Sequence, residues 1–130
     1  MSTYELVKAK AAAAKKAAGK LAITSTAIKN KAMLAMAQAL LDKQEEILAA
    51  NAIDMENAAA KGMKASMLDR LKLTPERIAG MAEGLEQVAA LPDPIGNIVG
   101  GSRLANGLTV TKVRVPLGVI GIIYEARPNV

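Results

Sequence analysis

The sequence predicts an α/β fold, and three observations support that prediction. Over residues 1–94, apolar side chains recur at three- and four-residue steps between residues that start and end helices. Asn106-Gly107 lies between two extended segments, a pattern typical of a β-hairpin. Residues 119–124 carry no charge, and a strand that is apolar on both faces belongs inside a sheet covered by helices. We therefore expect a helical part at 1–94, a hairpin at 95–117, and a buried strand with its following loop at 118–130.

The first half of the chain contains signals for three long helices. Ser2 or Thr3 can cap the first helix, which we expect to run to about Ala18 and to end at Gly19. The second begins near residues 24–26 and continues, with a break near Asp42, into a helical pattern that ends before Gly62. Its apolar face, expected to serve packing, consists of Met33, Met36, Ala37, Leu40 and Leu41, with Leu48 two turns further on.

Two further helices are expected before residue 95. Residues 66–71 predict a short one. Thr74-Pro75-Glu76 then combines a hydroxyl cap, a proline at the first helical position and an acid in the first turn, which together predict a helix start. The face of this last helix is formed by Ile78, Met81, Leu85 and Val88. Pro92 and Pro94 end it, because proline cannot donate a backbone hydrogen bond.

The hairpin should have one arm at 97–104 and the other at 108–115. In the second arm, Leu108 and Val110 share one parity while Val113 and Val115 share the other. This slip predicts a bulge or twist near Thr111-Lys112. Both faces of such an arm can be used, so we expect it to contact another subunit; an ordinary hairpin on its own domain is the alternative.

The apolar strand at 119–124 is followed by six residues only. A strand of this kind needs neighbours on both edges and a crossover helix, which together take about 30 residues or more. We therefore expect the chain to be the N-terminal part of a larger α/β protein. The alternative is a small α+β domain with one exposed strand edge.

Composition excludes several classes of chemistry. The 130 residues include no cysteine and no histidine, which excludes disulfides, thiolate chemistry, most zinc sites and any Ser-His or Cys-His nucleophile made by this chain alone. We therefore expect no metal site. No run approaches the ~20 apolar residues of a membrane span, and the N-terminus lacks the order of a signal peptide. We expect a cytoplasmic protein without a membrane partner.

The net charge of +5 belongs to one end of the chain. Residues 1–31 carry seven lysines against the single acid Glu5, whereas the remainder holds ten bases and eleven acids. Nucleic-acid surfaces favour arginine and stacking aromatic rings, and only Tyr4 lies near these lysines. A solvated helix face explains the charge better than a nucleic-acid partner.

The segment from Arg114 to Val130, RVPLGVIGIIYEARPNV, resembles the signature of gamma-glutamyl phosphate reductases, also called glutamate-5-semialdehyde dehydrogenases. The similarity continues through four earlier blocks: Ser25-Thr26, Glu46–Asn51, Leu68–Leu71 with Leu73–Pro75, and Leu91–Pro94. It covers the whole chain, which corresponds to about the first third of the usual length in that family.

This resemblance implies an aldehyde-dehydrogenase-like fold. Residues 1–94 would be the helical N-terminal part of a Rossmann-like nucleotide-binding domain, 95–117 the oligomerisation arm, and 118–130 the first strand of that incomplete domain. It implies NADPH-dependent reduction of L-glutamyl 5-phosphate to L-glutamate 5-semialdehyde with release of phosphate, the second step of proline biosynthesis from glutamate. A homo-oligomer is also implied. The family's nucleophile is a cysteine, so the 130 residues alone should be inactive.

The last residue of the apolar strand and three residues after it are site candidates, because ligands of open α/β sheets bind at the carboxyl ends of strands. Arg127 could hold a substrate oxyanion bidentately, or pair with Glu125 as a surface arginine. Asn129 could support an oxyanion, as asparagines after the corresponding strand do in the wider superfamily, or serve only as a turn residue. Glu125 could position a substrate amine or cap a turn, and Tyr124 could pack under the cofactor.

Two other functions are compatible with parts of the sequence. The Ala-, Lys- and Met-rich helices suit a non-catalytic helical interaction module, and the basic first helix suits a nucleic-acid-binding domain. Gly118 and Gly121 are not a dinucleotide fingerprint, because they precede and interrupt the strand instead of leading into a helix.

Overall fold

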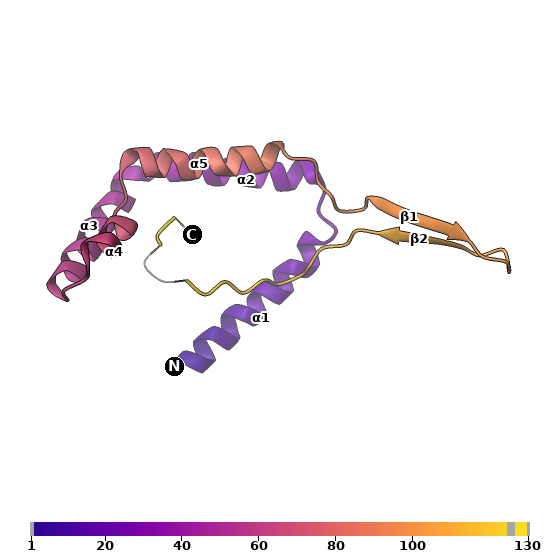
Figure 1. The fold of residues 1–130 in the computed structure, drawn as a ribbon, viewed down its shortest axis with the longest axis horizontal. Helices are drawn as coiled ribbons and strands as arrows, with labels where there is room; N and C mark the ends of the chain where they lie inside the picture. The colour runs from indigo at the N-terminus through magenta and orange to yellow at the C-terminus, as the bar shows by residue number, and fades with distance from the viewer. Residues whose placement is uncertain (1, 125–126, 130) are drawn as a thin grey trace. The chain divides into compact units, whose positions relative to one another are not determined.

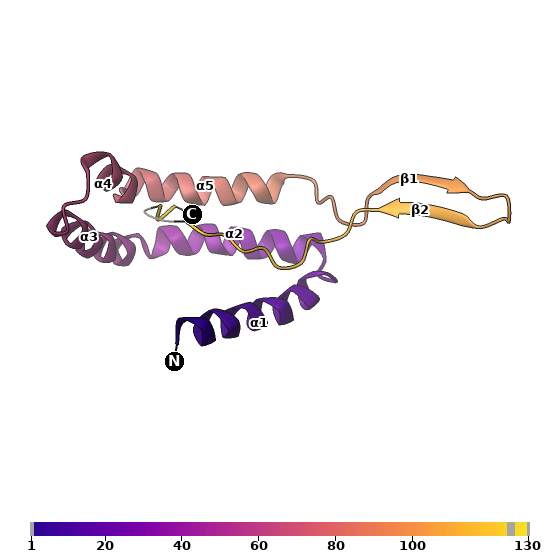
Figure 2. The same cartoon turned by 60° about the horizontal axis from the view of Figure 1, so that its bottom comes forward.

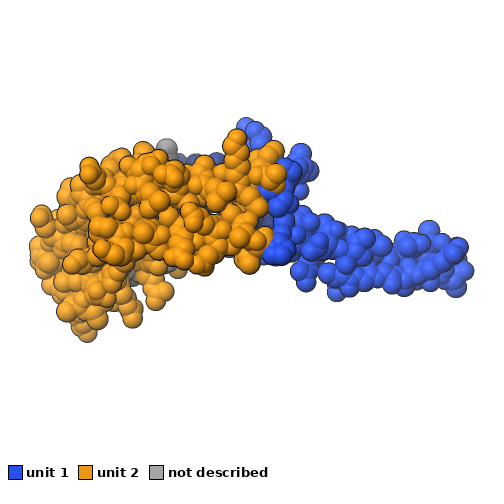
Figure 3. Space-filling model, turned by 90° about the horizontal axis from the view of Figure 1, so that it is seen from above, with its two compact units in different colours: residues 1–26, 92–121 blue, residues 27–91, 122–130 orange. Residues whose placement is uncertain are grey.

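The computed structural model describes residues 2–124 and 127–129 and forms two compact units, coloured separately in Figure 3. The first unit comprises residues 1–26 and 92–121, and the second comprises residues 27–91 and 122–130. Helices and a single antiparallel pair of strands make up the regular structure of the described residues. The domain division at residues 94 and 117 stays a prediction.

Helix α1 (Thr3–Leu21) starts where the sequence indicates but ends later. The Ser2 hydroxyl accepts a hydrogen bond from the Glu5 backbone N–H at 3.2 Å, and the Glu5 carboxylate accepts one from the Ser2 backbone N–H at 2.8 Å. The predicted end at Gly19 is wrong, because one glycine costs a helix only about 1 kcal/mol. The Thr24 hydroxyl instead donates to the Lys20 carbonyl at 2.8 Å, which satisfies an acceptor of the last turn.

Four helices form most of the second unit: α2 (Thr26–Asp42), α3 (Gln44–Ala60), α4 (Ala65–Leu71) and α5 (Pro75–Ala90). Helices α2 and α5 lie side by side and run in opposite directions, with α3 and α4 at one end of the pair (Figures 1 and 2). The break near Asp42 is confirmed, and so is the left-handed residue after α3, Gly62, at φ 74°. In the part of the chain that is described, no helix is both long and apolar enough to cross a membrane.

The start and end of α5 follow the sequence signals. Thr74 caps the helix by accepting a hydrogen bond from the Arg77 backbone N–H at 3.2 Å, and Pro75 is its first residue. Leu91, before Pro92, is extended at φ −70° and ψ 148° and ends the helix.

The core is small and consists mainly of alanine. Ile78 is fully buried, and the other buried apolar residues are Ala37, Ala58, Ala82 and Ala89. The predicted packing faces are therefore correct only in part: Ala37 and Ile78 are buried, but Met36 and Val88 are 56% and 52% exposed. A core made mainly of alanine has few large buried side chains, and many of the longer apolar side chains on α2 and α5 stay partly exposed.

The hairpin consists of β1 (Ile98–Arg103) and β2 (Thr109–Val113), paired antiparallel. Its loop contains Asn106-Gly107 as predicted, with Gly107 at φ 88° and its N–H bonded to the Leu104 carbonyl at 2.9 Å. The predicted irregularity is present, but the extra residue lies on the opposite strand. Ile98 pairs with Val113 and Gly100 with Lys112, so Val99 is the extra residue.

The strand predicted at 119–124 is not formed. These residues have no regular structure and no ladder partner among the described residues, and Ile123 is 103% exposed. A strand is stabilised by hydrogen bonds to a neighbouring strand, and the hairpin uses its own two strands for each other. The apolar pattern is thus present without the sheet it was expected to enter.

Candidate functional site

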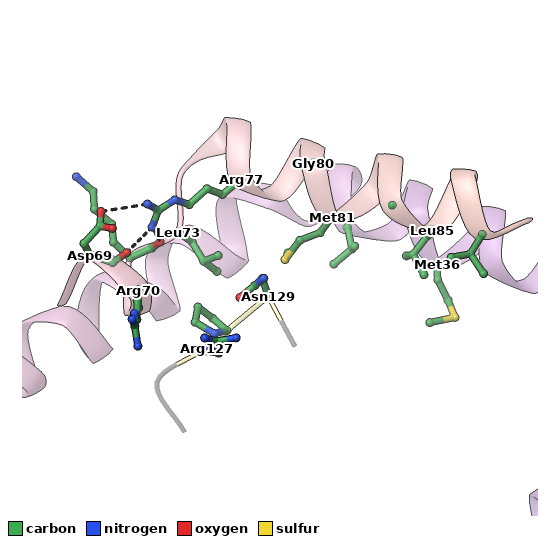
Figure 4. Close-up of a pocket in the computed structure, with 15 residues that line it drawn as sticks. Met36, Asp69, Arg70, Leu73, Arg77, Gly80, Met81, Leu85, Arg127 and Asn129 are labelled. Carbon is green, nitrogen blue, oxygen red and sulfur yellow. Dashed lines mark hydrogen bonds and ion pairs between the residues drawn. The ribbon is translucent and has the colours of Figure 1, made fainter. Parts of the chain in front are cut away.

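A groove of about 860 Å³ lies within the second unit. Its walls come from α2, α4, α5 and the short turn at residues 127–129 (Figure 4). Apolar side chains form one part of the lining, and charged side chains form another. The apolar part contains Met36, Leu40, Leu73, Met81, Leu85 and Val88, and the charged part contains Asp69, Arg70, Lys72, Arg77 and Arg127.

Asn51 fixes the connection that carries the charged end. This α3 side chain is 6% exposed, and its amide nitrogen donates to the Leu71 carbonyl at 2.9 Å. Its amide oxygen accepts from the Leu73 backbone N–H at 2.7 Å. Both bonds reach across 20 or more residues of sequence, so Asn51 holds the α4–α5 connection against α3.

Arg77 braces the same connection from α5. Its guanidinium contacts the Asp69 carboxylate at 3.0 Å and donates to the Lys72 carbonyl at 2.6 Å, and it also donates to the Asp69 carbonyl. Figure 4 shows Arg77 directed toward Asp69. These bonds satisfy much of the arginine fork, so Arg77 holds the groove wall in place.

The structure places two of the four predicted site residues at the groove. Arg127 and Asn129 both line it. Tyr124 does not line it and is 58% exposed, and Glu125 lies outside the described residues. The predicted roles of all four stay predictions.

Two residues of the groove region were not predicted. Asn51 and Arg70 lie within the blocks Glu46–Asn51 and Leu68–Leu71, but neither is marked by periodicity or by a chemical motif. The signal for Asn51 would be a polar residue on an otherwise apolar helix face. Arg70 has no such signal, because its position depends on how α4 packs.

The groove offers charged and apolar side chains, but it has no cysteine thiolate or histidine imidazole that could act as a nucleophile or a base. The sequence has no cysteine or histidine, and the described residues contain no cluster of acids that could hold a metal. Glu5 and Glu76, two carboxyls whose pKa is lowered, lie at helix N-termini, outside the groove lining. For Glu76 the causes are its own backbone N–H and then the Thr74 hydroxyl.

Comparison with known proteins finds relatives that carry one name. No family model matches the chain. It is 54% identical over 129 residues to a gamma-glutamyl phosphate reductase of Gloeobacter violaceus, covering 99% of this chain and 31% of the relative. It is 55% identical over 130 residues to a gamma-glutamyl phosphate reductase of Heliobacterium modesticaldum, covering 100% of this chain and 31% of the relative.

Solved structures agree with these sequences. The fold is similar to gamma-glutamyl phosphate reductase from Thermotoga maritima, with a TM-score of 0.86 and 43% identity over 89% of this chain and 28% of that one. The Saccharomyces cerevisiae enzyme gives a TM-score of 0.77 and 31% identity over 89% of this chain and 29% of that one. The chain thus spans about 31% of the length of its curated relatives and matches their N-terminal part.

Proposed function

We propose that the chain is the N-terminal part of an oxidoreductase of proline biosynthesis that reduces L-glutamyl 5-phosphate to L-glutamate 5-semialdehyde. The observation that supports this most strongly is 55% identity over all 130 residues to a protein named gamma-glutamyl phosphate reductase. In the proposed reaction a cysteine thiolate outside this chain attacks the acyl carbon and phosphate leaves. The resulting thioester accepts a hydride and releases the aldehyde and the thiolate.

The proposed cofactor is NADPH, which supplies the hydride when bound. Neither Gly118 nor Gly121 leads into a helix, so neither forms a dinucleotide fingerprint. We therefore assign the main cofactor contacts to other parts of the whole enzyme. Within this chain the proposed contribution is the groove, with Arg127 holding the substrate and Asn129 supporting the oxyanion. Glu125 is proposed as a further substrate contact and Tyr124 as a side chain that packs under the cofactor.

The hairpin is proposed to join subunits of a homo-oligomer. Val113, the last residue of β2, and Val115, two residues after it, are exposed at 43% and 72%. The edges of this two-stranded ribbon are free of further strands within the described residues. Changing both valines to lysine in the whole enzyme is expected to dissociate the assembly in sedimentation. An oligomer that stays intact would remove the hairpin from the contact.

A chimera tests the proposed activity. The matched N-terminal segment of the Heliobacterium modesticaldum enzyme is replaced by this chain, and the reverse reaction is followed as NADPH formed from glutamate 5-semialdehyde, phosphate and NADP⁺. We expect NADPH formation that requires phosphate, and growth without proline in a bacterium lacking its own reductase. Fractionation of those cells tests the proposed cytoplasmic location.

Two controls make the result decisive. The Heliobacterium enzyme without its N-terminal segment should be inactive, and the chimera should be inactive when phosphate is omitted. A chimera that folds and assembles but forms no NADPH contradicts the proposal and favours a non-catalytic helical interaction module.

A further inference from the structure

The groove contains two arginines that are structurally different. Arg77 is held by the Asp69 carboxylate and by two backbone carbonyls. Arg70, the residue after Asp69, has no hydrogen bond or ion pair within the described part of the chain, although it lines the same groove. Figure 4 shows the bonds of Arg77 and none at Arg70. Arg70 therefore has no evident role in holding this fold together.

The described residues that line the groove carry more positive than negative charges. Among the described residues that line the groove, Asp69 is the sole acid, and Arg77 already occupies its carboxylate. Arg70, Lys72 and Arg127 are left without an acidic partner in the described residues. Cations that share one groove repel each other, and an anion between them relieves the repulsion and gains charge-assisted hydrogen bonds.

The wall beside these cations is apolar and partly free of side chains. Leu73, Met81 and Leu85 line it, and Gly80 and Gly84 lie four residues apart on the same face of α5. A methyl group built at either glycine meets no atom within 4 Å, so the packing of this chain does not require glycine there. The helix backbone is thus open to close approach by an aliphatic stem.

We propose that Arg70, together with Arg127, binds a carboxylate or phosphate group of a small molecule whose aliphatic stem lies along α5. A planar guanidinium fork suits both of these anions, which is why arginine is preferred where bidentate recognition is needed. In the context of the proposed function, on which this identification of the ligand rests, the molecule is the acyl-phosphate substrate. Arg70 then adds a second arginine to the one expected from the sequence.

Anion binding at this site can be tested by titrating the 130-residue chain with small anions, which requires no enzyme assay. The probes are glutarate, which carries carboxylates on a short aliphatic stem, and inorganic phosphate, and the readout is the NMR signals of the arginine Nε–H groups. We expect Arg70 and Arg127 to shift together while Arg77 stays unchanged. A response to glutarate alone assigns a carboxylate site, and a response to phosphate alone assigns a phosphate site.

Matched variants separate binding from loss of fold. Arg70→Met should abolish the response, and Arg70→Lys should weaken it while keeping the charge. Lys64→Met removes one positive charge just before the same short helix and should leave the response unchanged. Circular dichroism checks that each variant keeps its helices. No response to either probe, or an unchanged response in Arg70→Met, overturns the proposal.

The chimera supplies the second readout. In the reverse assay, Arg70→Met is expected to raise the KM for glutamate 5-semialdehyde or for phosphate about tenfold or more and to leave the KM for NADP⁺ unchanged. A rise confined to the NADP⁺ KM would contradict the assignment. An inactive parent chimera would reject the proposed function, whereas the titration would still decide whether Arg70 binds anions.

Discussion

Helix α5 and the segment at residues 115–124 are both rich in apolar residues, yet they differ in burial and in regular structure. On α5, Ile78 is fully buried, whereas in the segment Ile123 is 103% exposed. A helix bonds its own backbone, and α5 also has a cap and neighbouring helices to cover it. An interior strand depends on neighbouring strands, and the described residues provide none. An apolar pattern thus fixes structure only where the same chain supplies the partner.

Truncating the same residue type in the two regions should show the largest difference. Ile78→Ala is expected to lower the free energy of unfolding by about 3 kcal/mol, because it leaves a cavity in a small core. Ile123→Ala should change it by less than about 0.5 kcal/mol. Urea denaturation followed by circular dichroism measures both. Equal losses would mean that residues 115–124 are packed in solution.

Removing the two hydrogen bonds of the Asn51 side chain should have the next largest effect on the free energy of unfolding. Asn51→Ala leaves the Leu73 N–H and the Leu71 carbonyl without their partner, at a cost of about 2 kcal/mol. Asn57→Ala, on the exposed side of the same helix, is the matched control and should be close to neutral. Faster hydrogen exchange at Leu73 in Asn51→Ala alone is the second measurement. Similar stability losses in both variants would mean that the two hydrogen bonds of Asn51 do not stabilise the α4–α5 connection.

The features that could be predicted from the sequence are the local ones. Thr74 with Pro75, Gly62 and Asn106-Gly107 each set the backbone within a few residues, and the structure confirms all of them. The end of α1 was missed because Gly19 is only weakly unfavourable in a helix, and the Thr24 hydroxyl donates a hydrogen bond to the Lys20 carbonyl in the later last turn.

The candidate site was only half predictable, for a physical reason. Arg127 and Asn129 could be named because they follow the apolar segment at residues 119–124, although that segment does not form the strand predicted from it. Arg70 and Asn51 depend on contacts between α3, α4 and α5 that no short pattern encodes. The bulge was placed on the wrong strand because parity shows that a register slips but not which strand carries the extra residue.

The cap of α5 should contribute less than the two hydrogen bonds of Asn51 and should also depend on pH. Thr74→Ala is expected to cost about 1 kcal/mol. The pKa of Glu76 is lowered by its own backbone N–H and by the Thr74 hydroxyl, so the variant should raise this pKa toward its usual value. Because the folded pKa is the lower one, this stabilisation is present above the unfolded pKa and is lost as pH falls through the folded pKa.

An NMR titration of the carboxyl groups checks this prediction. The pKa of Glu5 is lowered in the same direction by its hydrogen bonds to Ser2, first through the backbone and then through the hydroxyl. It should not change in Thr74→Ala, which makes it an internal control. If the Glu76 pKa also stays unchanged, the Thr74 hydroxyl does not act on that carboxyl.

The smallest expected effect is a gain in stability that separates folding from binding. Gly80→Ala should stabilise α5 by up to about 1 kcal/mol, because alanine is the better helix former and its methyl group meets nothing within 4 Å. Gly101→Ala is the contrasting control, because its methyl group would lie 2.9 Å from the Val110 carbonyl oxygen. If a ligand stem lies along α5, Gly80→Ala should also weaken the response to glutarate or phosphate. A variant that gains stability and keeps full binding would place the stem elsewhere in the groove.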